Sequence, residues 1–179
     1  MAQLLIMALL IGVVIAGATA SFPGRYHLLG TKKIYVQIVG RTVGNKTQTE
    51  FPVSGGPVQQ FPNYTPGYQA TYSAKFTKAL DYFSAQLGTI TGFIGATTNT
   101  STFQTGTIAF KDGSGSIYFS GTADGSLSSK FVFSITSGIG RYLGTFGDIQ
   151  VSLANVTDSG TSITVLYTVT LYATPRLRN

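Results

Sequence analysis

The sequence predicts an all-β protein, an eight-stranded antiparallel closed β-barrel. From residue 67 onward apolar and small polar residues alternate, which is the period of a strand with one buried face. Glycine-containing turn sequences such as Lys111-Asp-Gly-Ser-Gly and Asp158-Ser-Gly separate these runs, so successive strands are expected to join as antiparallel hairpins. Closure into a barrel removes the exposed edges of an open sheet.

The alternating runs predict eight strands in chain order. The clearest is 162–173, in which every second residue from Ile163 to Leu171 is apolar. The sequence predicts no helix apart from a single turn near 77–83. Residues 43–66 hold four prolines and two adjacent glycines, which predicts an irregular loop over one end of the sheet. The expected strands are 32–42, 67–78, 86–98, 102–111, 115–122, 129–136, 142–156 and 162–173.

The first twenty residues resemble a secretory signal peptide. An uncharged apolar run is followed by Ala18-Thr19-Ala20, a small-x-small cleavage pattern. An uncleaved anchor helix is the alternative, but the run is short for the roughly 20 residues that span a bilayer. We therefore predict that residues 1–20 are removed and that 21–179 form a single domain. That domain is expected to be secreted, to the apoplast in a plant, without stable membrane insertion.

Potential glycosylation sites agree with export. Asn45-Lys-Thr, Asn99-Thr-Ser and Asn155-Val-Thr are acceptor patterns, and Asn63-Tyr-Thr is a weaker one because Pro66 follows it. Cysteine is absent, so the domain must be held by its core and hydrogen bonds without disulfides.

Charge and composition exclude several classes of function. The net charge is +6, but only Lys32 and Lys33 are adjacent, whereas nucleic-acid-binding proteins usually cluster their basic residues. We expect no nucleic-acid partner. With no cysteine and one histidine, the usual nucleophilic triads and histidine-rich zinc sites are nearly excluded, and we expect neither a metal nor a cofactor.

The glycine-rich stretch from Ser137 to Gly147 predicts a barrel corner rather than a phosphate-binding loop. A phosphate-binding fingerprint needs G-x-G-x-x-G at the start of a helix. Here the third glycine is misspaced, and the residues after Gly147 alternate as a strand does. Glycine suits a tight turn or a close strand crossing.

The same stretch, Ser137-Gly-Ile-Gly-Arg-Tyr-Leu-Gly-Thr-Phe-Gly, resembles the glycine-rich segment of dirigent proteins and allene oxide cyclases. Phe76-Thr-Lys-Ala-Leu-Asp-Tyr and Leu87-Gly-Thr-Ile-Thr-Gly resemble a second motif pair of that superfamily, and Gly115-Ser-Ile-Tyr-Phe-Ser-Gly resembles its central hairpin strand. The resemblance covers roughly residues 32–173. It implies an eight-stranded barrel with an apolar cavity, assembled as a dimer or trimer.

The resemblance also implies two kinds of activity. Cyclases of this group close an unstable fatty-acid epoxide into a ring, whereas the secreted dirigent proteins steer the coupling of phenoxy radicals made by a separate oxidase. Export favours the dirigent side. The chain departs from the family at Phe146, where dirigent proteins have arginine, at Gln37, where they have aspartate, and at Ile94, where cyclases have cysteine.

Six residues are candidates for the site. Asp81 and Asp148 would act as general acid or base if apolar burial raised their pKa, and the alternative is a solvated carboxylate beside a cation. Arg141 follows the glycine turn and is the third catalytic candidate. Asp112, Asp124 and Asp158 fit turns instead, where aspartate caps the local backbone. The candidate ligand contacts are Gln37, Tyr142 and Phe146.

The preferred hypothesis is a secreted barrel that binds a small hydrophobic or phenolic molecule and steers its stereoselective coupling or cyclisation, by confining one reactive conformer. Whether it is an enzyme stays open. One alternative is a non-catalytic lipid or phenolic carrier, and another is a structural extracellular glycoprotein with a filled barrel. A pocket above about 300 Å³ would argue against the filled barrel, and Asp81 or Arg141 in its wall would favour the first hypothesis.

Overall fold

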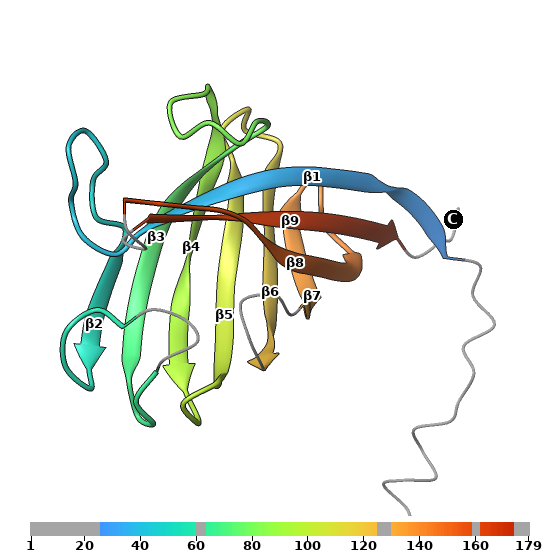
Figure 1. The fold of residues 1–179 in the computed structure, drawn as a ribbon. Helices are drawn as coiled ribbons and strands as arrows, with labels where there is room; N and C mark the ends of the chain where they lie inside the picture. Colours follow the sequence, from blue (N-terminus) through green and yellow to red (C-terminus); the bar gives the residue numbers. More distant parts are fainter. Residues whose placement is uncertain (1–25, 60–63, 125–129, 159–161, 174–179) are drawn as a thin grey trace, which may run out of the picture.

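The structure, a computed structural model, describes residues 26–59, 64–124, 130–158 and 162–173. It confirms the predicted fold class, because eight of its strands form a closed antiparallel barrel. A ninth, short strand lies beside them (Figure 1). The strands are β1 (His27–Val39), β2 (Glu50–Ser54), β3 (Gln69–Thr77), β4 (Gln86–Ala96), β5 (Ser101–Phe110), β6 (Gly115–Asp124), β7 (Phe131–Gly140), β8 (Thr145–Thr157) and β9 (Ser162–Ala173).

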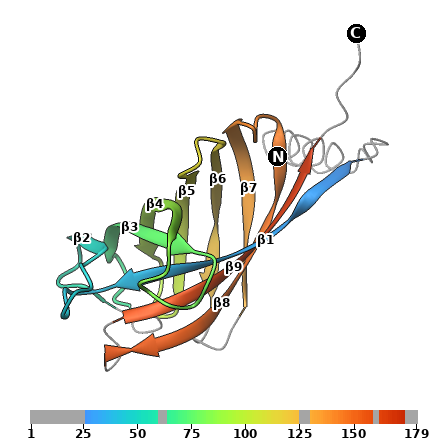
Figure 2. The same ribbon diagram turned by 90° about the horizontal axis from the view of Figure 1, so that it is seen from above.

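Neighbours in sequence are neighbours in the sheet from β2 to β9, and β9 then pairs with β1. The barrel closes where β1 meets β3, through the pairs Tyr35 with Thr77 and Val36 with Phe76. Figure 2 shows β3 to β7 as a curved wall, across which β8, β9 and β1 return. Each of the eight barrel strands therefore has a neighbour on both sides, as the closure argument required.

The prediction of an irregular loop over 43–66 was wrong for Glu50–Ser54, which form β2 and pair with β3. β2 is the last strand of the sheet and has no neighbour on its other side. Pro52 is compatible with such an edge position because no second partner needs its missing N–H group. The other eight strands lie within a few residues of their predicted ranges.

The glycine-rich stretch is a hairpin between two long strands. β7 continues to Gly140, a turn follows at 141–144, and β8 rather than a helix begins at Thr145. Gly140 has a φ of +64°, which favours glycine. At Gly147, where φ is +151°, a Cβ atom would lie 2.0 Å from the carbonyl oxygen of Thr170, so glycine permits the close approach of β8 and β9.

Inward-facing side chains fill the middle of the barrel. The rings of Phe119 and Phe133 stack with centroids 5.6 Å apart, and Tyr167 meets Phe119 edge-on at 6.3 Å. All three are buried in one large core cluster. A second, smaller cluster of Tyr64, Tyr68, Ala70 and Ala96 lies beside β2. Packed aromatic side chains therefore occupy this part of the barrel interior.

The predicted signal peptide, residues 1–20, lies outside the described residues, as does Asn63. Within the described ranges, no helix is long and apolar enough to cross a membrane.

Candidate functional site at the barrel mouth

The hairpin connections gather at two ends of the barrel. One end carries the β3–β4 loop at 78–85, the β5–β6 turn at 111–114 and the β7–β8 turn at 141–144, and we call it the mouth. The other end carries the connections from β2 to β3 and from β4 to β5, and we call it the base. The β1–β2 connection lies beside the β3–β4 loop, because Lys46 Nζ is 5.7 Å from the ring centroid of Tyr82.

A cavity of about 630 Å³ opens at the mouth, between β1, the ends of β3 and β5, and the start of β4. This volume lies within the usual range of small-molecule sites, about 300–1,000 Å³. Its apolar lining comes from four different strands: Ile34, Phe76, Leu87 and Phe110. The site is therefore built where the barrel closes, above the filled core.

The charged residues of the lining are four lysines and one aspartate: Lys32, Lys33, Lys78, Lys111 and Asp112. Thr31 and Gln86 complete the wall. One lysine is held in place, because its Nζ donates a hydrogen bond of 2.9 Å to the hydroxyl of Tyr142. The same Nζ lies 4.6 Å from the ring centroid of Phe110, within cation–π range.

Asp112 belongs to the turn, as its sequence context indicated. Its carboxylate accepts a hydrogen bond of 2.9 Å from the backbone N–H of Ser114. The hydroxyl and the N–H of Ser114 lower the pKa of Asp112, and the charges of Lys32 and Arg141 add to this effect. Asp112 is therefore ionised at neutral pH and is not suited to be a general acid.

Tyr142 packs against lining residues of the cavity. It is buried, and its ring lies 5.0 Å from that of Phe110. It thus contacts two lining residues, Phe110 and Lys32, without lining the cavity itself. Arg141 sits beside it in the exposed turn at the mouth, where its backbone N–H donates to the carbonyl of Ser114, and its side chain is not part of the lining.

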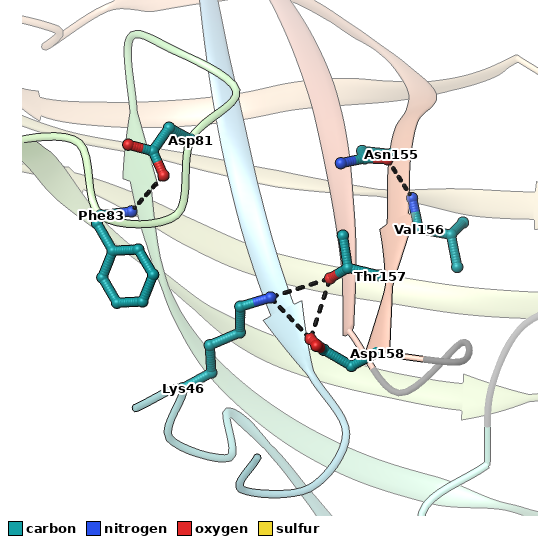
Figure 3. Close-up of polar contacts among 7 residues, drawn as sticks. All are labelled: Lys46, Asp81, Phe83, Asn155, Val156, Thr157 and Asp158. Atoms are coloured by element: carbon teal, nitrogen blue, oxygen red, sulfur yellow. Dashed lines mark hydrogen bonds and ion pairs between the residues drawn. The ribbon is translucent and has the colours of Figure 1, made fainter. Parts of the chain in front are cut away.

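Neither candidate carboxylate faces the cavity. Asp81 is exposed in the β3–β4 loop, where it accepts a hydrogen bond of 3.0 Å from the N–H of Phe83 and so caps its own loop (Figure 3). Asp148 precedes the buried Ile149 on β8, and alternation places it on the outer face of the barrel. The structure does not bring the two acids together.

Gln37 and Phe146 also lie away from the cavity. Gln37 is fully buried on the face of β1 opposite Val36, and its Nε2 donates 2.8 Å to the hydroxyl of Thr77. Phe146 lies on the outer face of β8, where its ring meets Tyr26 edge-on at 4.9 Å and stacks on Tyr172 at 5.8 Å. Gln37 therefore contributes to packing, and Phe146 to an outer aromatic group.

Sequence reasoning missed the lysines of the mouth. Lys78 and Lys111 lie just beyond Phe76 and Phe110, at the ends of β3 and β5. Both aromatic residues pair with Gly88 of β4, which brings the two strand ends together. The sequence signal that could have revealed them is an aromatic residue at the end of a strand with a lysine one or two positions after it.

A buried acid at the base was missed as well. Glu50 is 4% exposed, and its carboxylate accepts a hydrogen bond of 2.7 Å from the hydroxyl of Tyr68. Burial raises the pKa of Glu50, although the hydrogen bond from Tyr68 opposes the rise. Within the described residues, no three side chains among His, Asp and Glu converge as a metal site would require.

The three described sequons lie in loops or near the end of a strand. Asn45 and Asn99 are exposed in the connections after β1 and β4, and Asn155 is exposed near the end of β8. The side-chain oxygen of Asn155 accepts a hydrogen bond from the N–H of Val156, and Thr157 joins Lys46 and Asp158 in a polar cluster (Figure 3). All three asparagines are accessible, and none of them lines the cavity.

Comparison with solved structures identifies the fold. The barrel is similar to that of a pterocarpan synthase dirigent protein, GePTS1, with a TM-score of 0.70 and 16% identity over 88% of this chain and 96% of the other. The chain has the dirigent fold. A second such protein, PsPTS1, matches with a TM-score of 0.67 and 15% identity over 82% of this chain and 97% of the other.

The dirigent fold extends to other proteins. Pyocyanin demethylase matches this chain with a TM-score of 0.53 and 18% identity, over 79% of this chain and 99% of that one. No protein-family model matches the sequence, and no curated protein sequence matches it either. The predicted resemblance to dirigent proteins is thus confirmed by the barrel.

Proposed function

We propose that this protein binds a small hydrophobic or phenolic molecule in the mouth cavity and steers its stereoselective coupling or cyclisation. The observation that carries this proposal is the cavity of about 630 Å³ with Ile34, Phe76, Leu87 and Phe110 in its wall. Aromatic and aliphatic walls offer a flat apolar ligand the surface that it needs to leave water. The shared fold with dirigent proteins supports the same function.

Steering would come from confinement. The two carboxylates that the sequence suggested, Asp81 and Asp148, do not line the cavity, and Asp112 is an ionised turn cap. A rigid wall can favour one reactive conformer and one face of attack without transferring a proton. A radical substrate would be supplied by a separate oxidase. Secretion after cleavage of residues 1–20, glycosylation, and assembly as a dimer or trimer remain parts of the proposal.

A carrier that only binds the molecule is the second candidate. Its support is that neither Asp81 nor Arg141 contributes to the cavity wall. The third hypothesis, a structural protein with a solid barrel, fits the filled core but not the mouth, because the cavity exceeds the roughly 300 Å³ at which ligand sites begin.

The deciding experiment adds the purified protein to an oxidase and coniferyl alcohol and measures the enantiomer ratio of the products by chiral chromatography. We expect an enantiomeric excess with the native protein and its loss in Phe110→Ala and in Leu87→Ala. Phe103→Ala is the matched control, because Phe103 is 44% exposed on another part of β5. Circular dichroism verifies that each variant is folded.

Racemic product with the folded native protein would contradict the phenoxy-coupling form of the proposal. Mass spectrometry of molecules that copurify with the protein identifies what the cavity holds. A phenolic or lipid that copurifies unchanged, together with racemic product, would support the carrier instead.

A further inference from the structure

Four of the twelve basic residues of the chain line one cavity. They are Lys32 and Lys33 on β1, Lys78 in the β3–β4 loop and Lys111 in the β5–β6 turn. Only the first two are neighbours in sequence. The pairing of β3 and β5 with β4 brings Lys78 and Lys111 together, and barrel closure adds the lysines of β1. Basic residues that are dispersed in the sequence therefore form a group of four lysines around an apolar pocket, which we call the lysine rim.

This positive charge is not neutralised by the protein itself. In the described ranges the one ion pair is between Lys46 and Asp158, and neither residue lines the cavity. Asp112 is the single acid of the lining, and its carboxylate is already bound by Ser114. Four lysines against one aspartate leave an excess of three positive charges around the pocket.

One of these ammonium groups is fixed in position. Lys32 Nζ is hydrogen-bonded to the hydroxyl of Tyr142 and lies over the rings of Phe110 and Tyr142, at 4.6 and 5.4 Å from their centroids. Two contacts to rigid rings reduce the rotamers open to this side chain. Since an ammonium has three donors, one bond to Tyr142 leaves others for a ligand.

We propose that the mouth cavity selects a hydrophobic anion, a molecule with an aromatic or aliphatic body and one carboxylate- or sulfonate-type group. The body would lie against Phe76, Leu87 and Phe110, and the acid group would face Lys32 and its neighbouring lysines. This inference rests on the proposed function and names the ligand class of the same site. A neutral phenol of equal size would make the apolar contacts but leave the lysine rim without a partner.

Two fluorescent probes that share one body test the charge requirement. 1-Anilinonaphthalene-8-sulfonate carries a sulfonate, and N-phenyl-1-naphthylamine is its uncharged parent. We expect the sulfonate to bind about tenfold more tightly at low salt. Each exposed lysine contributes little to this difference, but several of them attract the same sulfonate group. This difference in affinity should shrink as sodium chloride rises to about 0.5 M, because salt at that concentration screens charges that are more than a few ångströms apart.

Charge-matched variants locate the effect. Lys78→Met with Lys111→Met should reduce binding of the sulfonate by severalfold and leave the neutral probe unchanged. Arg41→Met with Lys130→Met removes the same charge from exposed positions outside the cavity lining and should change neither affinity. Phe110→Ala should weaken both probes, because they share the apolar body.

The outcomes separate this inference from the function on which it rests. Equal affinity for the two probes would overturn the anion preference and leave the apolar site standing. Equal loss of sulfonate binding in the Lys78→Met/Lys111→Met variant and in the Arg41→Met/Lys130→Met control would do the same. Binding of neither probe, or binding that Phe110→Ala and Leu87→Ala do not weaken, would remove the cavity as a ligand site.

Discussion

The hydroxyl of Tyr68 donates a hydrogen bond of 2.7 Å to the carboxylate of Glu50, inside the small apolar cluster at the base of the barrel. Glu50 begins β2, and Tyr68 lies just before β3, so the bond joins the edge strand to the strand that it pairs with. An acid in such surroundings favours its neutral form, since burial penalises the charge.

Glu50→Gln should stabilise the protein at neutral and alkaline pH. Burial raises the pKa of Glu50 above its ordinary value of 4.5, so the folded state holds this proton more tightly than the unfolded state. The resulting stability is fully present below pH 4.5 and is lost as pH rises through the folded-state pKa. In urea unfolding from pH 4 to 8, the free energy of unfolding of the variant should therefore rise relative to that of the native protein. A difference between the two that does not change with pH would contradict this.

Gly147→Ala should destabilise the fold by about 2 kcal/mol or more. The new methyl group would have to occupy a site 2.0 Å from the carbonyl oxygen of Thr170, at a φ of +151°. Gly113→Ala is the control, because its φ of +72° is also strained but no atom lies within 4 Å of the added Cβ. It should cost about 1 kcal/mol. Equal denaturation midpoints for the two variants would show that the backbone shifts to relieve the contact between the new methyl group and Thr170.

Phe119→Ala should lower the free energy of unfolding by about 3–5 kcal/mol, because it leaves a cavity between Phe133 and Tyr167 in the middle of the core. Val132→Ala, which truncates a side chain that is 58% exposed, should change it by less than about 0.5 kcal/mol. Denaturant titrations of both variants provide the comparison. A small loss in Phe119→Ala would mean that the core collapses onto the vacated space.

Lys46→Met should raise the pKa of Asp158 towards its ordinary value of 3.8. The Lys46 ammonium donates a hydrogen bond of 2.7 Å to this carboxylate, and this bond, ahead of the one from Thr157, holds the pKa down (Figure 3). Carboxyl-carbon NMR titration measures the change directly. Asp112, whose pKa depends on Ser114, Lys32 and Arg141, serves as the internal reference and should not move.

The strands were predictable because their signal is local. Alternation along β9 identifies its buried row without knowledge of any partner, and glycine turns mark where each hairpin reverses. The same alternation already placed Asp148 beside Gln150, in the row opposite Ile149, so its outward position could have been deduced. The edge strand β2 was hidden because it is short and contains Pro52.

The composition of the site could not be derived in the same way. Lys78 and Lys111 meet because β3 and β5 both pair with β4, and Lys32 joins them only because β1 pairs with β3. No local pattern fixes the register of two strands so far apart in the chain. The burial of Glu50 has the same origin, since it depends on the pairing of β2 with β3.

The closure of β1 on β3 rests on two residue pairs, whereas β1 and β9 share twelve. It is the least-paired junction in the sheet, and one of its residues, Phe76, also forms part of the cavity wall. Separating β1 from β3 breaks fewer backbone pairs than separating any other two neighbours, so we expect local opening of the barrel to begin there. Opening there would displace Phe76 and widen the cavity entrance on the β1 side, which would admit a bulkier ligand.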